Sequence, residues 1–175
     1  KNGDIILCQH GDRRVAKITN AKSNNPKFVT IIDNYKGKRF NSPNDLSISK
    51  NGDIYFTDPP YGFWYDSKNF DNKYREIDYN GVYKLSNEGK VELISKEMTL
   101  PNGIALSLDE KYIYVNNSDR ENDPKIMRYD TTTFQGTLFF DGKELVKKYE
   151  GGFDGLKVHS SGNIFTSGPN GILII

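Results

Sequence analysis

The feature that most constrains the fold is a repeat of roughly fifty residues. Four segments share the pattern of a turn followed by an apolar strand: residues 2–7, 51–56, 109–114 and 161–166. We take one residue in each turn as a marker: Gly3, Gly52, Glu110 and Gly162. Successive markers are 49, 58 and 52 residues apart. Repeats of this length are typical of architectures in which each copy is one supersecondary unit.

A second motif precedes three of these turns at a constant distance. Its three copies read Pro-Asn-Asp, Pro-Asn-Gly and Phe-Asp-Gly. The polar residue of each copy lies eight residues before the marker: Asn44, Asn102 and Asp154. The first copy would place its polar residue before Lys1. The constant offset predicts that these three side chains occupy the same place in three successive repeats.

Each unit contains further strands. Third strands are expected at residues 14–18, 81–85 and 125–129, and fourth strands at 28–32 and 90–94. The chain has 11 Tyr, 10 Phe and 16 Gly, which suits short strands joined by turns, and no helical periodicity is sustained. Four strands in about fifty residues are typical of a propeller blade. We therefore predict an all-β fold, a β-propeller of which this chain covers three to four blades.

The predicted domain organisation follows from the need of a propeller ring to close. Residues 1–175 are expected to form a single β-propeller domain that is truncated at both ends, because a closed ring protects its strand edges. The apolar residues 172–175 predict one more strand. The alternatives are a compact four-bladed propeller and an open repeat.

Charge and cysteine content exclude several classes of protein. Lys and Arg total 24 and Asp and Glu total 23, a net charge of +1, which argues against a nucleic-acid partner. The adjacent Arg13 and Arg14 are interpreted as solvated side chains. Cys8 is the only cysteine, so an internal disulfide is impossible. No run of 18 apolar residues occurs, so no membrane partner is expected. Compartment and oligomeric state stay open.

Propeller geometry predicts which loops lie beside the repeated polar residues. The second strand of a blade runs antiparallel to the first and returns to the face where the first began. Four long polar or aromatic loops then share that face: residues 9–14, 57–64, 116–120 and 167–171. Long loops carry function more often than short turns. His10 is a candidate for substrate binding or acid–base chemistry, or else a loop histidine bonded to backbone. Tyr61 and Trp64 are candidates for the pocket mouth or else for packing within their loop, the second role foremost for Trp64.

The repeated polar residues predict a cation site near the channel axis. One carboxylate and two carboxamide oxygens are hard ligands, which suit calcium, magnesium or manganese. Zinc more often takes His or Cys. The alternative for Asn44 and Asn102 is a turn residue without further function. The sequence contains no Gly-x-Ser-x-Gly elbow and no phosphate-binding glycine loop.

Five segments together resemble the gluconolactonase and senescence-marker-protein-30 (regucalcin-like) family: residues 10–15, 41–45, 55–62, 100–103 and 153–158. The resemblance implies a six-bladed propeller with one divalent cation in its channel, Ca²⁺ foremost and Zn²⁺, Mg²⁺ or Mn²⁺ as alternatives. Asn102 and Asp154 match the Asn and Asp metal ligands of the family, and Asn44 matches a channel Asn that contacts substrate. The Glu ligand of the family has no match here. Ser42 stands where some members have an Arg, which leaves the sugar-acid preference open.

The implied activity is hydrolysis of a sugar lactone to an aldonic acid. The cation would polarise the carbonyl oxygen, and Asp154 is the catalytic candidate that positions or deprotonates the attacking water. His10 and Tyr61 join Asn44 as candidate substrate-binding residues. The expected partner is a small-molecule lactone. The competing hypotheses are a non-catalytic propeller that binds calcium or a partner protein, and a related propeller enzyme such as a paraoxonase-like esterase or a strictosidine-synthase-like protein.

Overall fold

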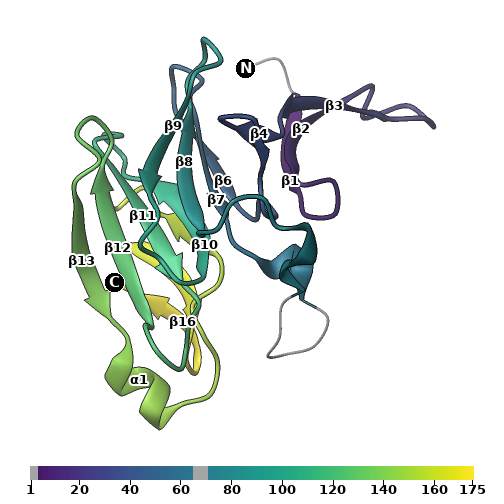
Figure 1. Cartoon of the computed structure of the whole chain (residues 1–175). Coiled ribbons are helices and arrows are strands. Elements are labelled where there is room, and N and C mark those ends of the chain that lie inside the picture. Colours follow the sequence, from purple (N-terminus) through teal and green to yellow (C-terminus); the bar gives the residue numbers. More distant parts are fainter. Residues whose placement is uncertain (1–3, 65–70) are drawn as a thin grey trace.

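A computed structural model describes residues 4–64 and 71–175 and shows an all-β chain. Four antiparallel sheets follow one another in chain order, and we call them blades 1 to 4 (Figure 1). Blade 1 contains β1 (Ile5–Gln9), β2 (Arg14–Thr19) and β3 (Lys27–Ile32). Blade 2 contains β6 (Leu46–Ile48), β7 (Ile54–Asp58), β8 (Gly81–Leu85) and β9 (Val91–Ser95). Blade 3 contains β10 (Pro101–Leu106), β11 (Tyr112–Asn117), β12 (Lys125–Asp130) and β13 (Gly136–Asp141). Blade 4 contains β14 (Leu156–Val158), β15 (Ile164–Gly168) and β16 (Gly171–Ile174).

Shorter elements connect the blades. A two-stranded hairpin, β4 (Asn34–Tyr35) and β5 (Lys38–Arg39), lies between blades 1 and 2 in the chain. Two 3₁₀ turns, η1 (Tyr61–Phe63) and η2 (Asn72–Tyr74), follow β7, and the helix α1 (Lys143–Lys148) follows β13. No helix in the described ranges is long and apolar enough to cross a membrane.

The predicted strands are confirmed, and the structure adds elements that the sequence analysis did not name. The expected third and fourth strands are β2, β3, β8, β9 and β12, and the apolar residues at the end form β16. The additions are β13, the β4–β5 hairpin and the short helices. The first predicted turn includes Asn2 and Gly3, which lie outside the described residues.

The turn markers share one backbone conformation, which confirms the repeat register. Gly52 has φ +97°, Glu110 has φ +59° and Gly162 has φ +92°, all in the left-handed region. The N–H of each donates to the carbonyl oxygen three residues earlier, on Ser49, Ser107 and His159 respectively. Glycine reaches this region at little steric cost, which explains why two of the three turns carry it.

The core lies between adjacent blades, because alternate residues of a strand point to opposite faces of its sheet. Along β7, Ile54 and Phe56 join the cluster shared with blade 1, whereas Tyr55 joins the cluster shared with blade 3. A third cluster lies between blades 3 and 4 and includes Ile126 and Phe153. All five residues of β7 are buried, since blades cover both of its faces.

Aromatic rings fill the space between blades 1 and 2. The ring centroids of Phe40 and Phe56 lie 5.1 Å apart in an edge-to-face arrangement, and Tyr83 lies 5.1 Å from Phe40 and 5.4 Å from Phe56. All three side chains are fully buried. Such aromatic pairs each add about 0.5–1.5 kcal/mol beyond area burial, so they stabilise the packing of the segment around Phe40 against blade 2.

Arg13 corrects the interpretation of the arginine pair as solvated. Its guanidinium donates to the carbonyl oxygens of Phe40 (2.6 Å), Tyr74 (3.0 Å) and Arg39 (3.3 Å), and the residue is buried. These carbonyls come from segments distant in the sequence, so Arg13 ties the loop after β1 to the chain entering blade 2. Arg14 bonds to Gln9, Thr30 and Asp12 near the surface.

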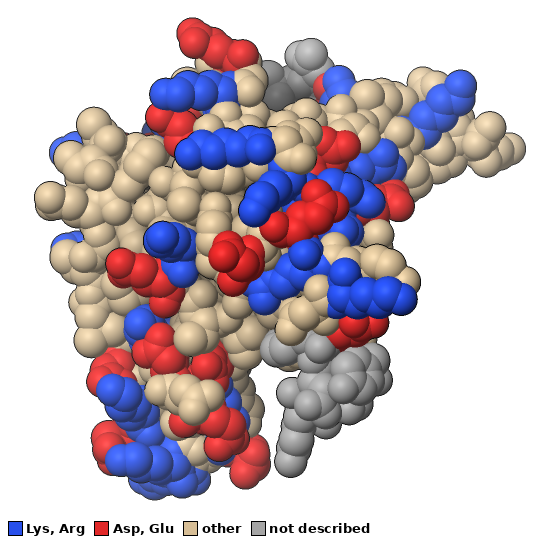
Figure 2. Space-filling model, in the orientation of Figure 1, with Lys and Arg blue, Asp and Glu red and all other residues tan. Residues whose placement is uncertain are grey.

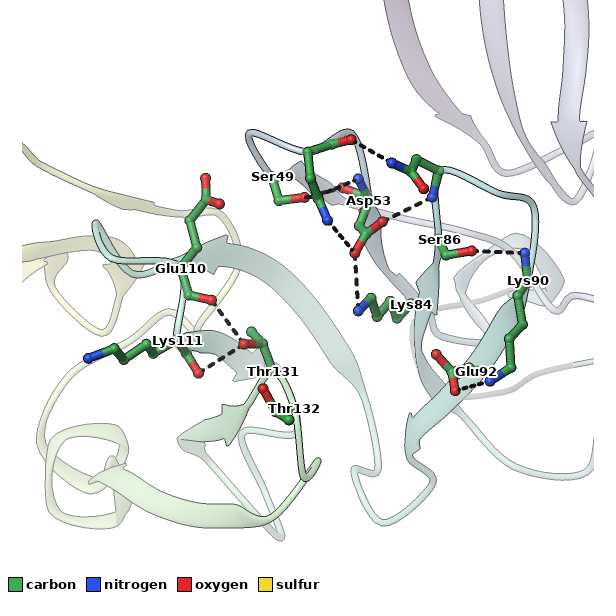
Figure 3. A network of polar contacts seen from close by, with 12 residues as sticks. Ser49, Asp53, Lys84, Ser86, Lys90, Glu92, Glu110, Lys111, Thr131 and Thr132 are labelled. Atoms are coloured by element: carbon green, nitrogen blue, oxygen red, sulfur yellow. Dashed lines mark hydrogen bonds and ion pairs between the residues drawn. The ribbon is translucent and has the colours of Figure 1, made fainter.

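Polar contacts on the short-turn face serve the fold. The Asp53 carboxylate accepts from the backbone N–H of Asn87 (2.9 Å) and pairs with Lys84 at 3.1 Å (Figure 3). The Lys50 N–H donates to Glu110 at 2.9 Å and so links blades 2 and 3. Over the face seen in Figure 2, Lys and Arg side chains lie among Asp and Glu side chains.

Candidate functional site

The three repeated polar residues converge on one open pocket of about 440 Å³ on the long-loop face. The pocket lining comprises Asn44, Tyr61, Trp64, Asn102, Ser118, Gly152, Phe153 and Asp154. The expected convergence of equivalent positions from successive blades is therefore observed. Tyr61 and Trp64 both line the pocket, and their ring centroids lie 4.8 Å apart.

The innermost strands position these residues through contacts between blades. Asn102 belongs to β10, whereas Asn44 and Asp154 each lie two residues before their strands. The Gly103 N–H donates to the carbonyl oxygen of Asp154 (2.9 Å), and the Thr57 hydroxyl donates to that of Asn102 (2.8 Å). Each blade thus holds the backbone of the next at the level of the pocket.

Gly103 permits this close approach. A Cβ added there would lie 2.2 Å from the carbonyl oxygen of Asp154 and 2.7 Å from the Leu156 nitrogen. Both are backbone atoms, so the clash can be relieved only by moving β10 away from β14. The glycine of the Pro-Asn-Gly motif therefore sets the spacing between Asn102 and Asp154.

We expect Gly103→Ala to destabilise the protein by about 1–3 kcal/mol, the usual cost of overpacking. The matched control is Gly155→Ala in the Phe-Asp-Gly copy, because a Cβ at Gly155 meets nothing within 4 Å. Urea denaturation of both variants measures the difference. Equal stability of the two variants would contradict the account of Gly103.

The Asn102 carboxamide is held by its nitrogen. Its Nδ2 donates to the Ser118 Oγ at 2.9 Å and to the Tyr61 hydroxyl at 3.4 Å. No described residue donates to its Oδ1, and this oxygen is not among the fully enclosed polar atoms that lack a partner. The oxygen is therefore accessible and uncommitted.

The Asp154 carboxylate is likewise uncommitted. The residue is exposed, and within the described parts of the chain no hydrogen bond or ion pair involves its carboxylate oxygens. Its backbone is held firmly, since Asn116 Nδ2 donates to the Asp154 carbonyl oxygen at 2.7 Å and to the Thr166 hydroxyl at 2.7 Å. The side chain is thus free to bind while its backbone stays fixed.

His10 reaches the pocket through Asn44. The Nε2 of His10 lies 3.3 Å from the Nδ2 of Asn44. An amide nitrogen can only donate, so this arrangement requires an unprotonated Nε2. Partial burial lowers the pKa of His10, which favours the neutral ring. His10 therefore contacts one of the residues predicted to bind substrate and does not itself line the pocket.

Tyr61 contributes a neutral hydroxyl. The hydroxyl donates to the carbonyl oxygen of Leu100 at 3.1 Å. Burial raises the pKa of Tyr61 to about 12, and side-chain contacts with Ser118 and Asn102 oppose that rise. The phenol consequently keeps its proton at neutral pH.

Asp58 shapes the segment that carries Asn44. One carboxylate oxygen accepts from the Asn41 N–H (2.8 Å) and the other from the Ser42 N–H (2.7 Å). Asp58 is fully buried, and burial raises its pKa to about 7 against the opposing effect of these bonds and of Arg13 and Arg75. The carboxylate thus fixes the chain just before Asn44.

Ser42 has a structural role at the position where some family members carry Arg. Its hydroxyl donates to the Pro59 carbonyl oxygen at 2.6 Å and accepts from the Gly62 N–H at 2.8 Å. These bonds tie the Asn44 segment to η1, and Ser42 is fully buried. The residue therefore supports the pocket wall from behind.

Three residues that organise the site were not proposed from the sequence as site residues: Ser118, Asn116 and Asp58. Ser118 and Asn116 fall within residues 116–120, which were predicted to form a loop, and that prediction was the only feature pointing to them. The structure places Asn116 in β11 instead. Within the described residues, no group of three or more His, Cys, Asp or Glu side chains is placed to hold a metal ion. The candidate ligands are instead one carboxylate, Asp154, and one carboxamide, Asn102.

The family model described as the SMP-30/gluconolactonase/LRE-like region matches residues 1–174. The chain belongs to this family. It is 42% identical over 183 residues to a gluconolactonase of Zymomonas mobilis, an alignment that covers 99% of this chain and 48% of that protein. A lactonohydrolase of Aspergillus oryzae is 26% identical over 168 residues, covering 85% of this chain and 38% of the relative.

Solved structures of a gluconolactonase and of a regucalcin share the fold. A gluconolactonase from Xanthomonas campestris superposes with a TM-score of 0.80 at 26% identity, covering 98% of this chain and 55% of that one. A calcium-binding regucalcin from Agrobacterium tumefaciens gives a TM-score of 0.66 at 16% identity, covering 96% and 50% respectively. The chain therefore spans about half the length of these relatives. The predicted propeller fold and family are confirmed, whereas six blades in the whole protein remain a prediction.

Proposed function

We propose that the protein carrying this chain hydrolyses a lactone in the pocket lined by Asn44, Asn102 and Asp154, with a divalent cation as cofactor. The observation that carries the proposal is the convergence of these residues, two of which present uncommitted oxygens. Family membership and the similarity to gluconolactonases support it.

The chemistry of the donor set fits a hard cation. Asn102 Oδ1 and the Asp154 carboxylate would hold it, and both are oxygen ligands of the kind that calcium takes. Calcium prefers six to eight oxygens, so water, substrate and further protein residues must complete its shell. The bound cation would polarise the lactone carbonyl and stabilise negative charge developing on its oxygen.

The residues of this chain would orient the substrate and transfer the proton that the attacking water loses. The oxygen of a water molecule attacks the carbonyl carbon, the acyl C–O bond of the ring breaks, and the ring oxygen leaves as an alcohol after taking up, by way of Asp154, the proton that the water loses. The Asp154 carboxylate is available to orient that water and accept its proton. Asn44 would contact substrate hydroxyls, with His10 accepting from its amide. Tyr61 and Trp64 offer an aromatic wall to the carbon face of a sugar ring.

We expect a chelator to abolish hydrolysis of glucono-1,5-lactone and one divalent cation to restore it. Proton release at constant pH measures turnover as Ca²⁺, Mn²⁺, Mg²⁺ and Zn²⁺ are added back in turn. Circular dichroism of the chelated protein is the control for folding. Full activity of the metal-free protein would contradict the cofactor. A folded, metal-loaded protein without activity on lactones or aryl esters would contradict the hydrolase.

A further inference from the structure

Two hydroxyl groups beside Asn102 have each committed their only hydrogen elsewhere. Ser118 Oγ donates to the Phe153 carbonyl oxygen, and the Tyr61 hydroxyl donates to the Leu100 carbonyl oxygen. A hydroxyl has one hydrogen and two lone pairs, so toward Asn102 each of these oxygens can only accept. The half of the carboxamide that faces them must therefore be the NH₂ group.

We infer that Ser118, supported by Tyr61, is a positioning residue that fixes the carboxamide orientation of Asn102 and presents its Oδ1 to the cation. Without these acceptors, the amide could turn by half a rotation and present NH₂ instead, which repels a cation. The inference rests on the proposed function for the role of the cation. The orientation itself stands on the hydrogen bonds alone.

The surroundings of Ser118 make this arrangement rigid. Phe153, whose carbonyl oxygen Ser118 engages, is fully buried in the cluster between blades 3 and 4. The carbonyl oxygen of Leu100, which accepts from the Tyr61 hydroxyl, also accepts from the Ser118 N–H at 2.8 Å. Outer-sphere partners of this kind orient metal ligands and raise affinity.

Binding of Mn²⁺ alone, followed by electron paramagnetic resonance, tests the inference. We expect Ser118→Ala to weaken Mn²⁺ binding about tenfold, and Ser118→Thr, which retains the hydroxyl, to restore most of the affinity. Ser86→Ala is the matched control, because Ser86 Oγ accepts from a backbone N–H on the opposite face. Thermal unfolding of each variant separates positioning from loss of structure.

A second measurement uses the metal-free protein. In a ¹⁵N spectrum, the Asn102 side-chain amide is identified as the resonance lost in Asn102→Ala. We expect Ser118→Ala to shift this resonance and to speed its hydrogen exchange, while Ser86→Ala leaves it unchanged. An unchanged resonance in Ser118→Ala overturns the inference.

The failures of the two proposals can be told apart. If wild type binds Mn²⁺ and Asn102→Ala does not, but Ser118→Ala binds like wild type, the positioning role is wrong and the metal site stands. If wild type binds no Mn²⁺, the metal site of the proposed function is wrong, and a positioning role toward a cation falls with it.

Discussion

Asp154→Ala is expected to lower kcat/KM for lactone hydrolysis at least a hundredfold, the scale observed when a transition-state stabilising group is removed. The carboxylate is exposed in the pocket and has no partner among the described residues, so no structural contact is lost with it. Its backbone stays anchored by Asn116 and Gly103. The fold should therefore survive while the activity does not.

Asp154→Asn separates the two roles assigned to the carboxylate. It keeps an oxygen ligand but cannot accept a proton at neutral pH. If Asp154 acts as base, Asp154→Asn loses turnover while Mn²⁺ binding persists. If it acts mainly as ligand, activity and Mn²⁺ binding fall together and excess metal recovers part of both. The control is Asp119→Ala, which removes a neighbouring carboxylate that bonds Asn122. Undiminished activity of Asp154→Ala would contradict the assignment of the active site to this pocket.

The parts of the fold that were predictable depend on local pattern. Strand positions followed from the repeat, and the convergence of Asn44, Asn102 and Asp154 followed from one offset kept in three copies. In a propeller, residues at the same position of successive blades lie close together around the axis. The convergence could therefore be predicted without knowing any individual contact. The strand β13 was not named, and its residues are largely exposed, which leaves a weak apolar pattern.

The features that could not be predicted are hydrogen bonds between residues that lie far apart in the sequence. Arg13 binds the carbonyl of Phe40, 27 residues away, and Asn116 binds that of Asp154, 38 residues away. Every residue has the same backbone carbonyl group, so no sequence pattern indicates which carbonyl a given side chain will bind. The orientation of the Asn102 amide depends on where Ser118 and Tyr61 send their hydrogens, which only the assembled blades determine.

Asp58→Asn is expected to lower the free energy of unfolding by about 1–3 kcal/mol, the cost of leaving a buried backbone N–H without an acceptor. Both carboxylate oxygens accept from backbone N–H groups, of Asn41 and Ser42. An amide retains one acceptor and places its NH₂ against the other N–H. The exposed Asp12→Asn serves as control and should stay within about 0.5 kcal/mol of wild type.

The pH dependence gives the same residue a second test. The pKa of Asp58 is raised to about 7 in the folded state, so this group binds a proton more readily in the folded than in the unfolded chain. Its contribution to stability is complete at pH below the unfolded pKa and is lost as pH rises through about 7. The stability difference between wild type and Asp58→Asn should therefore narrow as the pH rises from about 4 to about 7, measured by urea denaturation.

The same substitution should also reach the pocket, because Asp58 fixes the chain immediately before Asn44. Loosening that segment frees Asn44 from its contact with His10 while leaving Asn102 and Asp154 in place. We expect Asp58→Asn to raise KM for the lactone more than it lowers kcat, and to leave Mn²⁺ binding unchanged. A loss of Mn²⁺ binding equal to that of Asp154→Ala would show instead that Asp58 supports the whole pocket rather than its substrate side.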